Sequence, residues 1–161
     1  MKKLVLMLML LAPMTMMAQK FGKVNTQTIM QALPDVAKAN YELEALQKQK
    51  DNELKAMQEE FQRKADEYQK GASTMNATAK QQKETELQGL QQKIQQAYQD
   101  GQQELQKKSN ELMQPIVAKV RAAIDVVGKA GNYTYIFEEG AAIYTGSNVV
   151  DVTKEVQSKI K

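Results

Sequence analysis

The 161-residue chain contains no cysteine, no histidine and no tryptophan. Without cysteine it can form no disulfide and can carry no lipid on an N-terminal cysteine. Without cysteine or histidine it can hold neither a Ser-His-Asp triad, nor a Cys-His pair, nor a zinc site built on these ligands. The sequence also lacks a glycine-rich phosphate loop. These absences argue against an enzyme, and we expect no catalytic residue, no metal site and no cofactor.

Paired carboxylates leave a hydrolase as the one enzymatic alternative. Glu59 and Glu60 are adjacent, but neighbours on a helix point about 100° apart, which favours a solvated helix face. Glu138 and Glu139 precede Gly140, a pattern typical of a hairpin turn. Both pairs therefore have a plainer structural interpretation.

Residues 1–18 are expected to be a cleaved secretory signal peptide. Two lysines provide the positive start, residues 4–12 form an apolar run too short to span a bilayer, and Ala18 is a small residue suited to cleavage. Cleavage near Ala18 would leave an exported protein that begins near Gln19. A membrane anchor is the alternative interpretation of this segment.

The net charge argues against a nucleic-acid partner. The chain has 22 basic and 19 acidic residues, a net charge of +3. Removal of Lys2 and Lys3 with the signal peptide leaves 20 basic against 19 acidic residues, a net charge of +1. A protein so balanced exerts little long-range attraction on a polyanion.

Two long segments, residues 34–70 and 79–113, carry apolar residues at helical spacing in positions that reflect about residue 74. An antiparallel hairpin needs this reflection, because each helix can bury its narrow apolar stripe only against the other. The steps of three and four residues repeat every eleven, at about 3.67 residues per turn, which indicates little supercoiling. We therefore predict a helical arm over 34–113 with its tip near 71–78. The predicted seam comprises Leu43, Leu54, Met57, Phe61, Leu87, Leu90, Ile94 and Leu105.

The predicted tip is rich in basic residues. Residues 61–83 contain five cations and only Asp66 and Glu67 as anions, a net charge of +3. Such a tip could contact an anionic membrane surface or an acidic partner, with Met75 as an adaptable apolar contact. Ordinary solubilising lysines on a coiled-coil spacer are the alternative. The basic residues are Arg63, Lys64, Lys70, Lys80 and Lys83.

The remaining residues, 19–33 and 114–161, are expected to form a small β-rich body. Runs of β-branched and aromatic residues between glycine-containing turns are typical of short strands. Tyr133, Tyr135 and Phe137 would share one strand face, given the alternation of side chains. The predicted strands are 21–25, 132–137, 141–145 and 149–150.

Helices are expected to flank these strands. A short helix over 26–33 should end at Pro34, which can itself begin the arm. The second arm helix should continue past Pro115 until glycines at 128 and 131 stop it. Asp151 is predicted to be the N-cap of a last helix.

About 63 residues, divided between the two ends of the chain, make a body that is marginal by itself. Apolar residues on both faces of the central strand indicate cover from other subunits, so we expect an oligomer joined through the body. A ligand pocket is the alternative interpretation of the aromatic cluster. The candidate interface residues are Phe21, Val24, Tyr133, Tyr135, Phe137, Ile143 and Tyr144.

The two ends of the chain carry recognisable motifs. A short strand ends in Val24-Asn25, Leu33-Pro34 leads into the arm, and residues 142–148 read AIYTGSN before Asp151-Val152-Thr153. In these motifs the chain resembles the OmpH family of periplasmic chaperones. The resemblance covers the whole mature chain in order. The ends of the chain are the specific part of this resemblance, because coiled-coil arms occur in many unrelated proteins.

The resemblance implies an α+β fold, in which a small β-rich body carries a long antiparallel α-helical coiled-coil hairpin arm. It further implies a jellyfish-like homotrimer that acts in the periplasm as an ATP-independent holdase for unfolded outer-membrane proteins. Family members are often strongly basic, and the mature chain, near +1, departs from that pattern. The alternative function is a structural adaptor that docks on an envelope partner through its hairpin tip.

Overall fold

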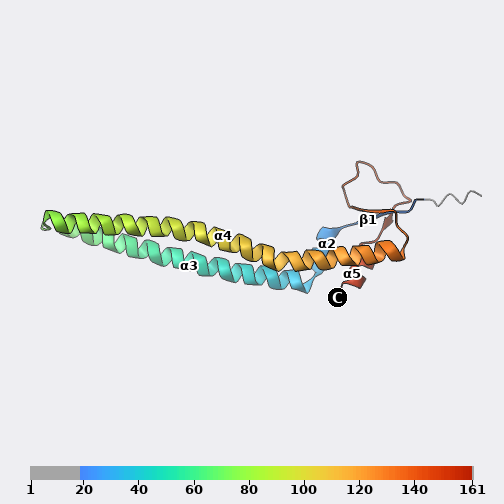
Figure 1. Ribbon diagram of the computed structural model, residues 1–161, viewed down its shortest axis with the longest axis horizontal. Helices are drawn as coiled ribbons and strands as arrows, with labels where there is room; N and C mark the ends of the chain where they lie inside the picture. The colour runs from blue at the N-terminus through green and yellow to red at the C-terminus, as the bar shows by residue number, and fades with distance from the viewer. Residues whose placement is uncertain (1–18, 161) are drawn as a thin grey trace, which may run out of the picture. The chain divides into compact units, whose positions relative to one another are not determined.

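A computed structural model describes residues 19–160 of the chain (Figure 1). The predicted signal peptide, residues 1–18, lies outside the described residues. The chain divides into two compact units, one of which is Gln27–Arg121. The other comprises, among the described residues, 19–26 and 122–160. Within residues 19–160, no helix combines the length and the apolar character needed to span a bilayer.

The unit Gln27–Arg121 is built from helix α3 (Pro34–Gly71) and most of helix α4 (Ala77–Ala130), which lie side by side in Figure 1. The short helix α2 (Thr26–Ala32) precedes them. Pro34 occupies the first turn of α3, where a missing N–H breaks no helical bond, and Leu33 before it is extended. Helix α4 continues through Pro115, as predicted.

Polar contacts between α3 and α4 set the register of the hairpin. The two residue numbers in each contact add up to between 150 and 154, so the helices run antiparallel about residue 76. The predicted centre, residue 74, was wrong by two positions. Knobs of one helix fit between residues of its partner, so apolar residues need not stand directly opposite one another. The contacts are Asp35–Lys119, Glu42–Lys108, Lys50–Glu104, Lys64–Glu86 and Tyr68–Glu84.

The turn of the hairpin explains where α4 begins. The side-chain Oδ1 of Asn76 accepts a hydrogen bond from the backbone N–H of Ala79 at 2.9 Å, the geometry of an N-cap. This cap starts α4 at Ala77, two residues before the predicted start.

The seam of the hairpin is thin. All eight predicted seam residues are half-buried, because two helices alone cannot enclose a side chain on every side. Small residues permit the closest packing: Ala39 is 2% exposed. Gly101 is buried against the aliphatic stem of Lys50, whose Cβ lies 3.7 Å from where a Cβ of residue 101 would be.

The second unit contains a three-stranded parallel sheet with the order β2-β1-β3. Its strands are β1 (Phe21–Val24), β2 (Tyr135–Glu138) and β3 (Val150–Asp151). Helix α5 (Thr153–Lys159) follows β3. Val24, Val127, Val152 and Val156 are at most 3% exposed and form the core of this unit. The strands are shorter and fewer than the predicted β-rich body implied.

The predicted strand over residues 141–145 is wrong. Gly140 adopts φ +84°, and the N–H of Ala141 donates to the carbonyl of Glu138, which closes a turn after β2. The following residues form an irregular loop up to β3, which runs parallel to β2 and so does not return as a hairpin. High β-propensity cannot make a strand without a partner, and both sides of β1 are occupied by β2 and β3.

The end of α4 differs from the prediction in its chemistry. Asn132, not a glycine, adopts the left-handed conformation, with φ 52°. The N–H of Tyr133 donates to the carbonyl of Gly128, and the N–H of Asn132 to that of Lys129, which together form a Schellman motif. This motif occupies residues that were predicted to be strand, so β2 begins only at Tyr135.

The start of α5 follows the prediction with a shift of one residue. The N-cap residue is Val152, but Asp151 supplies the cap through its carboxylate, which accepts the N–H of Thr153 at 2.9 Å. Thr153 lowers the pKa of Asp151 below its ordinary value, first through its side chain and then through this backbone hydrogen bond. In turn, the Thr153 hydroxyl oxygen accepts the backbone N–H of Asn25 and ties α5 to the end of β1.

Candidate functional site

Three aromatic rings are stacked on one face of the sheet. The register pairs Phe21 with Tyr135 and Lys23 with Phe137, so that Phe21, Tyr135 and Phe137 share this face. Their ring centroids lie 5.7 to 6.3 Å apart, with interplanar angles of 6 to 23°. Tyr135 is 58% and Phe137 44% exposed. An open aromatic surface of this kind is a candidate site of interaction.

The opposite face of the sheet is packed against the core. A Cβ placed on the buried Gly22 would lie 3.1 Å from the ring of Tyr133 and 3.3 Å from Ile136. Tyr133 therefore lies on the face of Gly22 and Ile136, and the prediction that it shares a face with Tyr135 was wrong. Val24 is also buried, at 3% exposure. The alternation of side chains failed at Tyr133 because the strand begins two residues after it.

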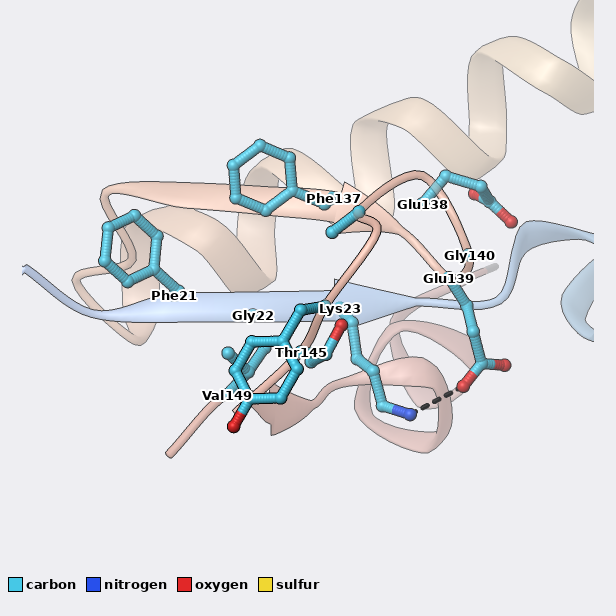
Figure 2. Close-up of a pocket in the computed structure, with 11 residues that line it drawn as sticks. Phe21, Gly22, Lys23, Phe137, Glu138, Glu139, Gly140, Thr145 and Val149 are labelled. Carbon is cyan, nitrogen blue, oxygen red and sulfur yellow. Dashed lines mark hydrogen bonds and ion pairs between the residues drawn. The ribbon is translucent and has the colours of Figure 1, made fainter. Parts of the chain in front are cut away.

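A loop adjoins the aromatic face. Residues 139–149 leave a cavity of about 220 Å³ between the loop and the sheet, lined by Phe21, Phe137 and Tyr144 among others (Figure 2). Most of this loop is exposed: Tyr144 is 85% exposed, and Ile143 is completely exposed. The structure thus places Tyr144 in the cavity lining with Phe21 and Phe137, and it leaves Ile143 exposed on the loop.

The carboxylates at the end of β2 have structural partners. Glu139 forms an ion pair with Lys23 at 2.6 Å (Figure 2). It also accepts a hydrogen bond from Asn25 at 2.8 Å. The hydrogen bond from Lys23 is the main reason that the pKa of Glu139 lies below its ordinary value. Glu138 accepts the backbone N–H of Thr26, the first residue of α2. These hydrogen bonds tie the end of β2 and the turn after it to the end of β1 and the start of α2.

The tip of the hairpin is less basic in space than along the chain. Because the helices reflect about residue 76, the part of the hairpin that begins at residue 61 also includes residues 84–91. Residues 61–91 contain five basic and four acidic residues, a net charge of +1. The stretch 61–83, from which the basic tip was predicted, does not contain Glu84 and Glu86.

Three of the five tip cations are engaged in ion pairs. Lys64 and Lys83 both contact Glu86, and Arg63 contacts Glu67. Among the described residues, Lys70 and Lys80 have no ion-pair partner. Met75 lies half-buried in the turn, where its terminal methyl is 2.7 Å from the Cβ position of Gly71. The free charge of the tip therefore comes from two lysines.

Two tyrosines on the arm are exposed, and for Tyr98 the apolar pattern had indicated burial in the seam. Tyr98 continues the periodic spacing of the second seam helix, yet it is 56% exposed. Tyr41, on α3, is 75% exposed. A spacing of three and four residues is compatible with a position inside a narrow seam or at its edge. Only the packing shows that Tyr98 lies outside the seam. Apart from such isolated residues, the outer surface of the arm is polar.

The chain belongs to the class of α+β proteins that combine a long helical hairpin with a small parallel-sheet unit. The sequence model of the outer membrane protein (OmpH-like) family matches residues 20–160, and the chain belongs to this family. No curated protein sequence was found to match it. A crystal structure of an OmpH-like outer membrane chaperone from Caulobacter crescentus is similar, with a TM-score of 0.76 and 15% identity. The match covers 88% of this chain and 83% of the Caulobacter chain, and it shows the shared fold.

Proposed function

We propose that this protein is an ATP-independent holdase chaperone of the periplasm. In this role it is a homotrimer that encloses unfolded outer-membrane proteins between its helical arms and prevents their aggregation. Its membership of the OmpH-like family and the similarity of its fold to the Caulobacter OmpH-like outer membrane chaperone support a chaperone role. The proposal needs no active site, and the engaged carboxylates Glu138 and Glu139 agree with that.

The observation that carries the proposal is the open aromatic face formed by Phe21, Tyr135 and Phe137. Parallel sheets are almost always covered on both faces, because their connections place other elements over them. Here the core covers one face, and the other leaves rings 44 to 58% exposed. Ile143 and Tyr144, exposed on the adjoining loop, add apolar surface that another subunit can cover. Self-association through this face is therefore the first half of the proposal.

The polar arm supports the second half. Most of its apolar residues pack in its own seam, so little apolar surface is left for association between neighbouring arms. Scattered exposed groups such as Tyr41 and Tyr98 can each touch a client weakly. Several weak contacts inside one assembly act at high effective concentration. They can therefore retain a client although each segment of the client binds only weakly. Exposed polar groups keep the client from meeting other unfolded chains.

The adaptor alternative places the function at the hairpin tip. Docking requires a defined anchor, whereas the tip has a net charge of +1 and three of its five cations are already paired. Contact with an anionic membrane surface through Lys70 and Lys80 stays compatible with the chaperone. Charge reversal of Lys70 and Lys80 should abolish partner binding by an adaptor, but should only weaken or slow a holdase.

A light-scattering experiment tests the proposal. Mature protein beginning at Gln19 is expected to have the mass of three chains and to suppress the aggregation of a denatured outer-membrane barrel diluted from urea. The same assay without nucleotide checks that ATP is not required. A monomer that leaves aggregation unchanged would overturn the proposal.

A further inference from the structure

We propose that Gln19 becomes the N-terminal residue on export and cyclises to pyroglutamate, which closes the mature chain with a neutral lactam. This inference rests on the proposed export to the periplasm, because it needs cleavage after Ala18. It does not depend on the holdase activity.

The neighbouring residue is firmly attached to the body. The carbonyl of Lys20 accepts the N–H of Thr134 at 2.8 Å, and its ammonium donates to the carbonyl of Gly131 at 3.0 Å. The same ammonium lies 4.1 Å from the centroid of the Tyr133 ring, a cation–π contact. Gln19 is exposed. Cleavage after Ala18 would therefore leave a single free residue in front of this anchor.

A free N-terminal glutamine carries both reactants of the cyclisation. The neutral α-amine attacks the side-chain Cδ, a C–N bond forms, the bond from Cδ to the amide nitrogen breaks, and ammonia leaves. No oxidant, reductant or second substrate is consumed. An α-amino group has an ordinary pKa of about 7.7–8, so a useful fraction is neutral near pH 7. The five-membered ring forms within one residue and benefits from a high effective concentration.

The position gives the modification a consequence. β1 begins at Phe21, two residues after Gln19, and it is the central strand to which both β2 and β3 pair. Trimming by an aminopeptidase would remove Gln19, then Lys20, and would then enter this strand. A lactam has no free amine, so such an enzyme cannot start. It also removes a positive charge beside Lys20.

Intact-mass spectrometry tests the proposal on protein exported by a bacterial host from the full chain and measured when freshly purified. The expected mass is that of residues 19–161 less one ammonia, with no amine-reactive label on the N-terminus. The matched variant Gln19→Asn should keep its full mass and its reactive amine, because its shorter side chain would have to close a four-membered ring. Aminopeptidase should shorten this variant and leave the wild-type protein intact.

Two results would overturn the proposal. One is a chain that begins at Gln19 with its full mass and a reactive amine. The other is a chain that begins at any other residue. Aggregation suppression is measured on the same samples, so a failed modification and a failed chaperone function give different results.

Discussion

Two glycines show how much a single Cβ depends on its surroundings. At Gly22 a Cβ would meet Tyr133 at 3.1 Å and Ile136 at 3.3 Å, whereas at Gly89, inside α4, it would meet nothing within 4 Å. We expect Gly22→Ala to lower the free energy of unfolding by about 1–3 kcal/mol through overpacking. Gly89→Ala should raise it by about 0.5–1 kcal/mol through helix propensity. Urea denaturation of both variants checks this, and equal stabilities would contradict it.

Titratable residues predict a broad stability plateau. The pKa of Glu86 is lowered from its ordinary 4.5, first by a hydrogen bond from Lys64, so this group adds stability above pH 4.5 that is lost as the pH falls through its lowered value. The pKa of Asp35 is lowered by Lys119 in the same way. Conversely, the pKa of Lys64 is raised from 10.5 by Glu86, and its contribution is lost as the pH rises through the raised value.

Denaturation midpoints should therefore stay level between about pH 5 and 10 and fall on both sides. In Glu86→Gln the denaturation midpoint should fall less steeply at acid pH, because a carboxylate with a lowered pKa has been removed. Lys55→Ala, at an ion pair that is about 70% exposed on both sides, serves as the control and should leave the profile unchanged. A Glu86→Gln profile identical to the wild-type profile would contradict the assignment.

At the scale of elements, the hairpin depends on a seam only one side chain wide. Leu54 is half-buried in the middle of α3. Leu54→Lys would place a charge in this seam, and because the long stem of lysine can reach solvent, we expect a loss of about 1–3 kcal/mol rather than complete unfolding. Thermal melting followed by circular dichroism should show an earlier helical transition.

Neighbouring Lys55 again offers the control, since Lys55→Ala removes a side chain outside the seam. If Leu54→Lys melted like the wild type, the seam would not hold the arm. If it instead dissociated the proposed trimer with the helices intact, the arms rather than the bodies would join the subunits.

At the scale of the whole molecule, the aromatic face should decide the oligomeric state. Replacing Tyr135 and Phe137 together with lysine would put two charges where we propose that another subunit packs, and unpaired buried charge opposes association. We expect light scattering to show monomers. Tyr41→Lys, at a residue that is 75% exposed on the arm, should leave the trimer intact. A double variant that stayed trimeric would exclude this face from the interface.

Local signals were sufficient for the helices. Pro34 starts α3, the polar residues before Ala77 turn the chain, and α4 continues through Pro115. Periodic spacing and backbone chemistry of this kind act within one or two turns, so a sequence displays them directly. The OmpH-like ends could also be recognised from the sequence, and the family match bears this out.

Contacts between distant residues decided the rest. The N-cap at Asn76 and the cross-helix ion pairs place the centre of the hairpin two positions after the predicted one. Glu86 consequently lies beside Lys64, and the net charge of the tip is lower than expected. The residues after Gly140 had strand propensity but no partner in a sheet whose central strand already had two.

The sequence by itself determined two long helices, their reversal and the apolar seam between them, because these depend on neighbours a few residues apart. Only the tertiary structure decided the parallel order of the sheet and which face of it keeps its aromatic rings open. Strand pairing joins residues such as Phe21 and Tyr135, which lie more than a hundred positions apart. No local propensity records such a choice, since it depends on which distant strands lie beside β1 in the folded chain.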